Sequence, residues 1–79
     1  MARIRTEKVV FTFHTTTQAI FMEKCCKEAG AAGRLIPVPR QISSGCGMAW
    51  CAQAEARPAL EELIQEKGVE TEAVYELLL

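Results

Sequence analysis

The amino-acid sequence predicts one α+β domain, residues 1–79, in which two helices cover one face of a four-stranded antiparallel sheet. A chain of 79 residues has room for one small hydrophobic core. Its apolar residues recur with the period of a strand in some segments and with the period of a helix in others. These segments follow one another as β-α-β-β-α-β, which in so short a chain is typical of the ferredoxin-like split βαβ fold.

Residues 8–13 alternate in polarity and predict the first strand. Its inward face is expected to hold Val9, Phe11 and Phe13. A helix is expected to begin at Thr15, whose hydroxyl can cap the first turn while the side chain of Gln18 reaches back to the cap. The buried stripe of this helix is expected to hold Ala19, Met22, Cys26 and Ala29. Gly30 is expected to end it.

The second and third strands are expected on either side of a polar loop, residues 40–45. Residues 34–39 are extended, and Pro37 and Pro39 lack the backbone N–H groups that a central strand needs on both sides. This segment is therefore expected to be an edge strand. Residues 47–53 alternate and predict the third strand, which in this fold lies between the first and second strands and runs antiparallel to both.

The last two elements are a helix and a strand. The second helix is expected to begin near Pro58, because proline fits the first turn of a helix, and to end at Gly68. Its buried stripe is expected to hold Leu60, Leu63 and Ile64. Residues 71–79 predict the final strand. Its inward side chains are expected to be Ala73, Tyr75 and Leu77.

Composition excludes several classes of function. Nine basic and ten acidic residues leave a net charge of −1, so no basic excess is present for binding nucleic acid. The longest apolar runs are far shorter than the roughly 20 residues of a membrane span. The N-terminal residues carry charge but no apolar core of a signal peptide. We therefore expect a cytoplasmic protein without nucleic-acid or membrane partners.

The four cysteines are Cys25, Cys26, Cys46 and Cys51. They form no C-x-x-C motif, so neither a zinc ribbon nor a thioredoxin-type redox pair is predicted. Cys46 and Cys51 are about 16 Å apart along an extended strand and on opposite faces, whereas a disulfide needs Cα atoms within about 7 Å. Cys46 and His14 supply at most two metal ligands. We therefore expect no metal and no cofactor.

The predicted topology places Cys46 in a distinctive environment. Antiparallel pairing of the first and third strands brings Cys46 beside His14 and the start of the first helix at Thr15 and Thr16. Arg40, at the end of the second strand, is expected on the same side. A helix N-terminus and an arginine both stabilise a thiolate over a thiol, so this cysteine is expected to be nucleophilic.

Gly45 and Gly47 flank Cys46 and carry no side chain, so a partner's backbone or a second sulfur can approach the thiol. The pattern therefore predicts an accessible, electropositive thiol site. A simpler interpretation also stays open. Cys46 then fills a tight turn, Arg40 is an ordinary solvated arginine, and His14 is a surface residue.

A pattern of motifs extends over nearly the whole chain: Phe13-His14-Thr15-Thr16 with Ala19 and Glu23, Pro37-Val38-Pro39-Arg40 with Ile42-Ser43, and Gly45-Cys46-Gly47. In this pattern the chain resembles the Se/S carrier protein-like family. The resemblance implies that Cys46 holds sulfur or selenium as a persulfide or selenosulfide, with Arg40, Ser43, Gly45 and Gly47 around it. It also implies donor and acceptor proteins as partners, and a transfer role more than that of a turnover enzyme. The pattern gives no role to His14, Cys25, Cys26 or Cys51.

Other functions stay open at this point. The helix start and the Gly-Cys-Gly loop could hold a small anion or a partner's terminus without covalent chemistry. The sheet face of Ala49, Cys51 and Gln53 could be covered by a partner, and a homodimer is one form of this. A thiol-dependent reductase is a weaker alternative, because no second cysteine is expected close enough to react with Cys46 except in another copy of the chain.

Overall fold

The structure, a computed structural model, describes residues 6–42 and 45–79. Its elements in chain order are β1 (Glu7–Thr12), α1 (Thr16–Ala29), β2 (Arg34–Pro37), β3 (Met48–Gln53), a 3₁₀ turn η1 (Ala54–Ala56), α2 (Arg57–Lys67) and β4 (Ala73–Leu78). The predicted β-α-β-β-α-β order is confirmed. The 3₁₀ turn between β3 and α2 is an addition that the sequence pattern did not predict.

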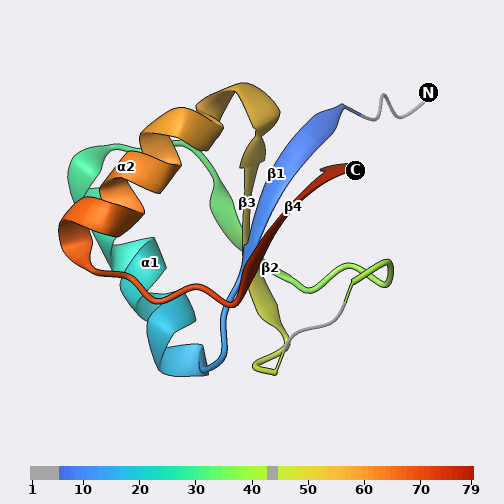
Figure 1. The fold of residues 1–79 in the computed structure, drawn as a ribbon, viewed down its shortest axis with the longest axis horizontal. Coiled ribbons are helices and arrows are strands. Elements are labelled where there is room, and N and C mark those ends of the chain that lie inside the picture. The colour runs from blue at the N-terminus through green and yellow to red at the C-terminus, as the bar shows by residue number, and fades with distance from the viewer. Residues whose placement is uncertain (1–5, 43–44) are drawn as a thin grey trace.

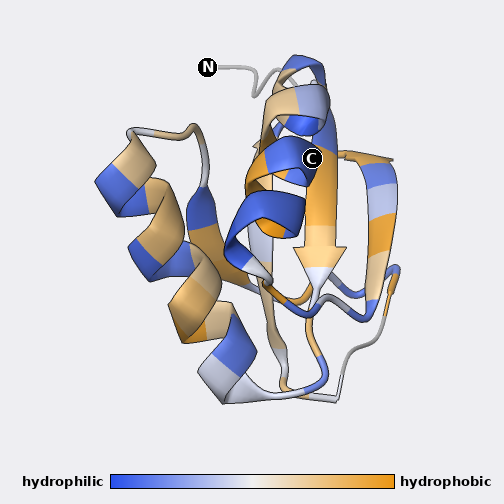
Figure 2. Ribbon diagram, turned by 60° about the vertical axis from the view of Figure 1, so that its left-hand side comes forward, coloured by the Kyte–Doolittle hydropathy of each residue, from blue (hydrophilic) through white to orange (hydrophobic). Residues whose placement is uncertain are grey.

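The four strands form one antiparallel sheet in the order β2-β3-β1-β4. This is the ferredoxin-like arrangement, with β3 between β1 and β2, as predicted. Both helices lie on one face of the sheet, and hydrophilic residues are spaced along each of them (Figures 1 and 2). β2 is an edge strand, in agreement with Pro37 at its end and Pro39 just after it.

The main core fills the space between the helices and the sheet. Phe13, Met22 and Leu60 are its largest fully buried side chains, and Trp50 lies among them with 3% of its surface exposed. The indole Nε1–H of Trp50 donates to the Ala32 carbonyl at 3.1 Å, so the polar group of this large side chain is satisfied inside the core.

The first helix is capped at both ends by the predicted residues. The hydroxyl oxygen of Thr15 accepts a hydrogen bond from the backbone N–H of Gln18 at 3.3 Å, and Gly30 is the C-cap. The second half of the predicted capping box is absent. The Gln18 Oε1 atom instead accepts from the backbone N–H of Glu70 at 3.0 Å, which links the start of α1 to the segment after α2.

The predicted buried stripe of α1 needs one correction. Cys25 is buried with 3% exposure, whereas Ala29 is exposed. The last turn of α1 is exposed, so Ala29 lies beyond the core. Cys25, one turn before Ala29, joins the buried stripe in its place. Cys26, Ala19 and Met22 are buried as predicted.

The predicted inward face of β4 is wrong. Pairing with β1 places Val74 opposite Phe11, and Val74 packs against the main core. Residues directly opposite in an antiparallel pair share a face, so the expected inward residues Ala73, Tyr75 and Leu77 lie on the other side of the sheet. The register of β1 therefore fixes which side chains of β4 are inward.

The other side of the sheet, called here the helix-free face, carries a second apolar cluster. Val10, Ala49 and Cys51 are buried in it. Val38 and Ile42, from the segment after β2, pack against this cluster together with side chains of the strands. Ala49 and Cys51 therefore lie on the helix-free face as predicted, and Gln53 is exposed. No helix in residues 6–42 and 45–79 is long and apolar enough to cross a membrane.

Candidate functional site

Cys46 lies in the turn that leads into β3, with its side chain half-buried against the helix side of the sheet. The backbone N–H of Met48 donates to the Cys46 Sγ at 3.4 Å, and the Met48 carbonyl accepts from the thiol at 3.4 Å. Both backbone polar groups of Met48 therefore contact the sulfur of Cys46.

Two glycines shape the turn around this sulfur in different ways. A Cβ atom at Gly45 would lie 3.2 Å from the backbone oxygen of His14, so this glycine allows the chain's own backbone to come close. Gly47 adopts a left-handed φ of 77°, and a Cβ atom there would meet nothing within 4 Å. The space beside Gly47 is therefore open, whereas Gly45 lies close to the backbone of His14, just before the start of α1.

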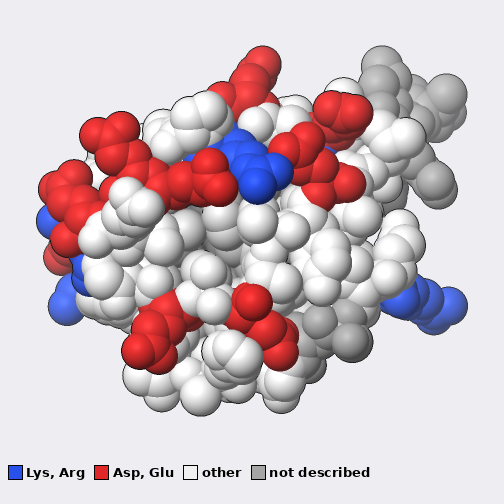
Figure 3. All heavy atoms as spheres, viewed as in Figure 1, with Lys and Arg blue, Asp and Glu red and all other residues white. Residues whose placement is uncertain are grey.

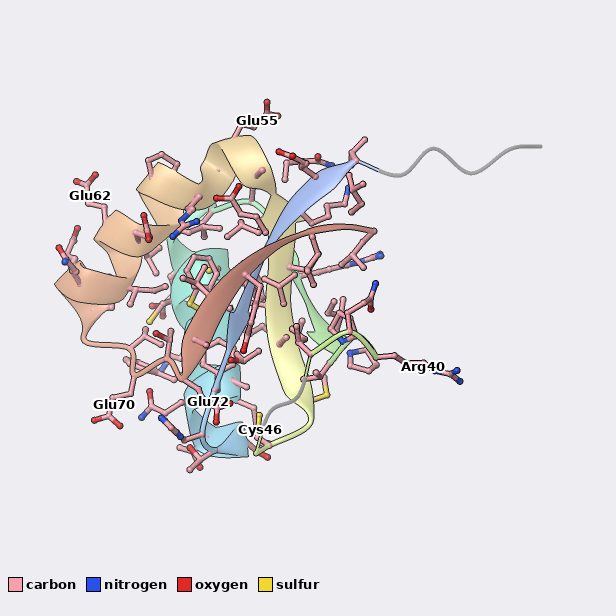
Figure 4. The ribbon with its side chains drawn as sticks, turned by 45° about the vertical axis from the view of Figure 1, so that its right-hand side comes forward. Arg40, Cys46, Glu55, Glu62, Glu70 and Glu72 are labelled. Carbon is pink, nitrogen blue, oxygen red and sulfur yellow. The ribbon has the colours of Figure 1, made fainter. Side chains whose placement is uncertain are left out.

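The start of α1 lies beside Cys46, as the topology predicts (Figure 4). Thr15 and Thr16 are exposed there, and the first turn of the helix contains no acidic residue. The partial positive charge of the helix N-terminus is therefore not neutralised by a carboxylate of its own first turn. His14 is exposed, and its Nδ1 lies 3.7 Å from a carboxylate oxygen of Glu72.

Arg40 is not brought to Cys46. It is exposed in a turn after β2, closed by a hydrogen bond from Ile42 N–H to the Pro39 carbonyl at 3.1 Å. Its side chain extends away from Cys46 into solvent (Figure 4). The expected electrostatic help from Arg40 is therefore not part of this arrangement, because the turn directs the guanidinium outward. Ser43 lies outside the described residues.

The other three cysteines are buried more deeply than Cys46. All four cysteines are in the thiol form, and Cys25, Cys26 and Cys51 are buried, with 3%, 1% and 9% of their surface exposed. Burial, with a smaller effect of the neighbouring Cys25, raises the pKa of Cys26 from 9.0 to about 11. Burial also raises the pKa of Cys51, although the nearby Lys8 and Arg34 act in the opposite direction. Cys46 is therefore the most exposed of the four thiols.

Cys46 and Cys51 lie on opposite sides of the sheet, as predicted. Cys46 packs against the main core beneath the helices, whereas Cys51 belongs to the cluster on the helix-free face. The described parts of the chain contain no group of three or more His, Cys, Asp or Glu side chains that could hold a metal ion.

The fold and the site together define a small α+β domain with a half-buried thiol at one end of its sheet. Residues 8–76 match the family described as "Putative Se/S carrier protein-like", and because this match spans most of the chain, the protein belongs to that family. The comparisons with curated proteins and with solved structures give no match.

Proposed function

We propose that the protein carries sulfur or selenium on Cys46 and passes it from a donor protein to an acceptor protein. Membership of the Se/S carrier protein-like family supports a carrier role. The difference in burial among the four cysteines supports Cys46 Sγ as the carrier atom. Cys46 is half-buried and its Sγ accepts a hydrogen bond from the Met48 N–H, whereas the other cysteines are buried.

Loading is a sulfur transfer without net oxidation. The Cys46 thiolate attacks the outer sulfur of a donor persulfide, forming a new S–S bond while the donor's own S–S bond breaks. The donor cysteine leaves as a thiolate, and the outer sulfur keeps its proton or negative charge. A donor selenosulfide reacts in the same way, with selenium as the outer atom.

Unloading reverses the roles at Cys46. A nucleophile of the acceptor attacks the outer sulfur or selenium, and Cys46 leaves as a thiolate. The Met48 N–H, 3.4 Å from Sγ, stabilises the negative charge on this leaving group. A terminal sulfur or selenium on Cys46 would be close to the start of α1, whose first turn contains no acidic residue, and a negative charge is favoured there.

The residues around Cys46 take separate roles in this proposal. Gly47 leaves space for the partner's reacting group, and Gly45 fixes the turn against His14. Thr15 and Thr16 present the helix start to the terminal sulfur. Arg40, exposed at its turn, is available to a partner protein more than to the sulfur. A reducing compartment such as the cytoplasm keeps the thiols of such a carrier reduced.

The decisive experiment is intact mass measurement after incubation with glutathione persulfide, before and after a thiol reductant. Wild type should gain one sulfur atom per chain and lose it on reduction, and Cys46→Ser should gain none. Cys51→Ser is the matched control, because it removes a buried thiol from the same strand region and should load like wild type. Adducts spread equally over all four cysteines, or none on Cys46, would contradict the carrier.

A further inference from the structure

The helix-free face carries two cations around Cys51. Arg34 on β2 lies directly opposite Cys51 on β3, and Cys51 lies opposite Val10 on β1. Lys8, two residues before Val10, shares this face, because side chains alternate along a strand. All three side chains, of Lys8, Arg34 and Cys51, therefore project from the same side of the sheet.

This face has a charge balance unlike that of the whole chain. Its strand residues are Lys8, Val10, Thr12, Arg34, Ile36, Ala49, Cys51, Gln53, Ala73, Tyr75 and Leu77, and none of them is acidic. The carboxylates gather elsewhere, notably over α2 (Figure 3). The face is therefore apolar and positively charged in a chain whose net charge is −1.

The surface around these cations is hollowed. Two adjoining hollows, of about 330 and 470 Å³, share Lys8, Arg34 and Cys51 in their linings. Ile36 and Leu79 complete the lining of the larger hollow. Together the two hollows are large enough to hold a small molecule whose polar group meets the cations.

The positive charge in the hollow is not neutralised within the described chain. Lys8 Nζ donates to the Thr6 hydroxyl at 2.7 Å. Among residues 6–42 and 45–79, no carboxylate forms an ion pair with Lys8 or Arg34. Both cations lower the pKa of the Cys51 thiol against the larger effect of burial, so both act on the same point in the hollow.

We propose that this hollow binds a small organic anion, namely a carboxylate on a short aliphatic chain. The guanidinium of Arg34 matches a carboxylate with paired N–H donors, and Lys8 adds a second positive charge. The aliphatic part lies against Ile36, Leu79 and the thiol of Cys51. This site is on the opposite side of the sheet from Cys46, so the inference does not depend on the sulfur-carrier function.

The test is a titration of the ¹⁵N-labelled full chain with hexanoate, followed by its amide NMR spectrum. We expect saturable shifts at Gly33, Cys51 and Ala52, which line the hollows or adjoin them. Hexanamide, with the same chain and no charge, should bind at least tenfold more weakly. Arg34→Gln should weaken hexanoate binding about tenfold, as expected for loss of a charged hydrogen bond.

Two control variants make the outcome specific. Arg40→Gln removes an exposed cation from a different turn and should bind hexanoate like wild type. Cys46→Ser should also bind like wild type, which separates this site from the carrier proposal. Equal binding of hexanamide, shifts away from the helix-free face, or the same affinity loss in Arg34→Gln and Arg40→Gln would each overturn the proposal. The dispersion of each spectrum confirms that the variant is folded.

Discussion

Cys46 and Cys51 are only five residues apart, yet they differ in burial, in hydrogen bonding and in the side of the sheet on which they lie. Cys46 precedes β3, is half-buried, and receives an N–H from Met48. Cys51 lies within β3, is buried on the helix-free face, and has a raised pKa. A Cβ atom at Gly47, beside Cys46, would meet no atom within 4 Å. One at Gly33, beside Cys51, would lie within 3 Å of Trp50 and Cys51. The surroundings of a thiol, on which its reactivity depends, therefore differ strongly between two cysteines only five residues apart.

The largest effect expected from this contrast is in the rate of alkylation. At neutral pH, iodoacetamide should modify Cys46 much faster than Cys26. Cys26 is buried and its pKa is raised from 9.0 to about 11, which lowers its own thiolate fraction about 100-fold. Cys25 and Cys51 should also react slowly, since both are buried. Peptide mass mapping over time measures the four rates. Similar rates at Cys46 and Cys51 would remove the contrast, and Cys46→Ser should leave no fast-reacting thiol.

The largest effect on stability is expected at the closed end of β3. A Cβ atom at Gly33 would lie 2.5 Å from Trp50 Nε1 and 2.7 Å from the Cys51 carbonyl oxygen, at a φ of 113°. Gly33→Ala should therefore lower the free energy of unfolding by about 3 kcal/mol, as overpacking in a core does. Urea denaturation followed by Trp50 fluorescence measures this change.

Gly47→Ala is the matched control at the open end. Its left-handed φ of 77° costs about 1 kcal/mol for a residue with a Cβ atom, and no neighbour lies within 4 Å. If the two substitutions destabilise the protein equally, the two ends of β3 do not differ in packing.

Alkaline pH should lower the stability of the protein through the buried thiol of Cys26. The pKa of Cys26 is raised from 9.0 to about 11 in the folded protein. Below pH 9 the Cys26 thiol is protonated in both the folded and the unfolded protein, so the raised pKa does not yet lower the free energy of unfolding. As the pH rises from 9 to 11 the unfolded chain loses its proton first, so the free energy of unfolding should fall by about 2 kcal/mol. Urea denaturation at several pH values measures the fall, and Cys26→Ala should show a smaller one. Identical falls in both proteins would contradict this role of Cys26.

The smallest effect is expected at the helix start beside Cys46. Thr15→Ala removes the oxygen that accepts from the Gln18 N–H and should lower the free energy of unfolding by about 1 kcal/mol. Thr17→Ala, one residue into the first turn of α1 and equally exposed, makes a suitable control and should change stability little. A similar loss in both variants, measured by thermal unfolding, would show that the hydroxyl of Thr15 has no special role.

The fold was predictable because several independent signals agreed. Pro37 and Pro39 mark an edge strand, Thr15 marks the start of α1, and Gly30 and Gly68 mark the ends of the two helices. All of these signals fit one element order. The inward face of β4 was not predictable, because all residues from Ala73 to Leu78 except Glu76 are apolar or aromatic and alternate poorly. There the register with β1 decides, and register is a property of the paired strands.

The candidate site was predicted in position but not in detail. Antiparallel pairing of β1 with β3 was enough to bring Cys46 to the start of α1. The roles of Met48 N–H and of the close approach of Gly45 to His14 depend on the local path of the backbone, which sequence patterns do not specify. The outward direction of Arg40 depends in the same way on the turn closed between Pro39 and Ile42.

The strand order has a consequence for how this chain reaches its structure. β1 pairs with β3 and β4, and β2 pairs with β3, so every ladder joins a strand of the first half to a strand of the second half. Neither half can form any part of the sheet alone. During synthesis no strand finds a partner until β3 has emerged, and folding therefore depends on contacts between residues distant in sequence, which slows it and makes it all-or-none.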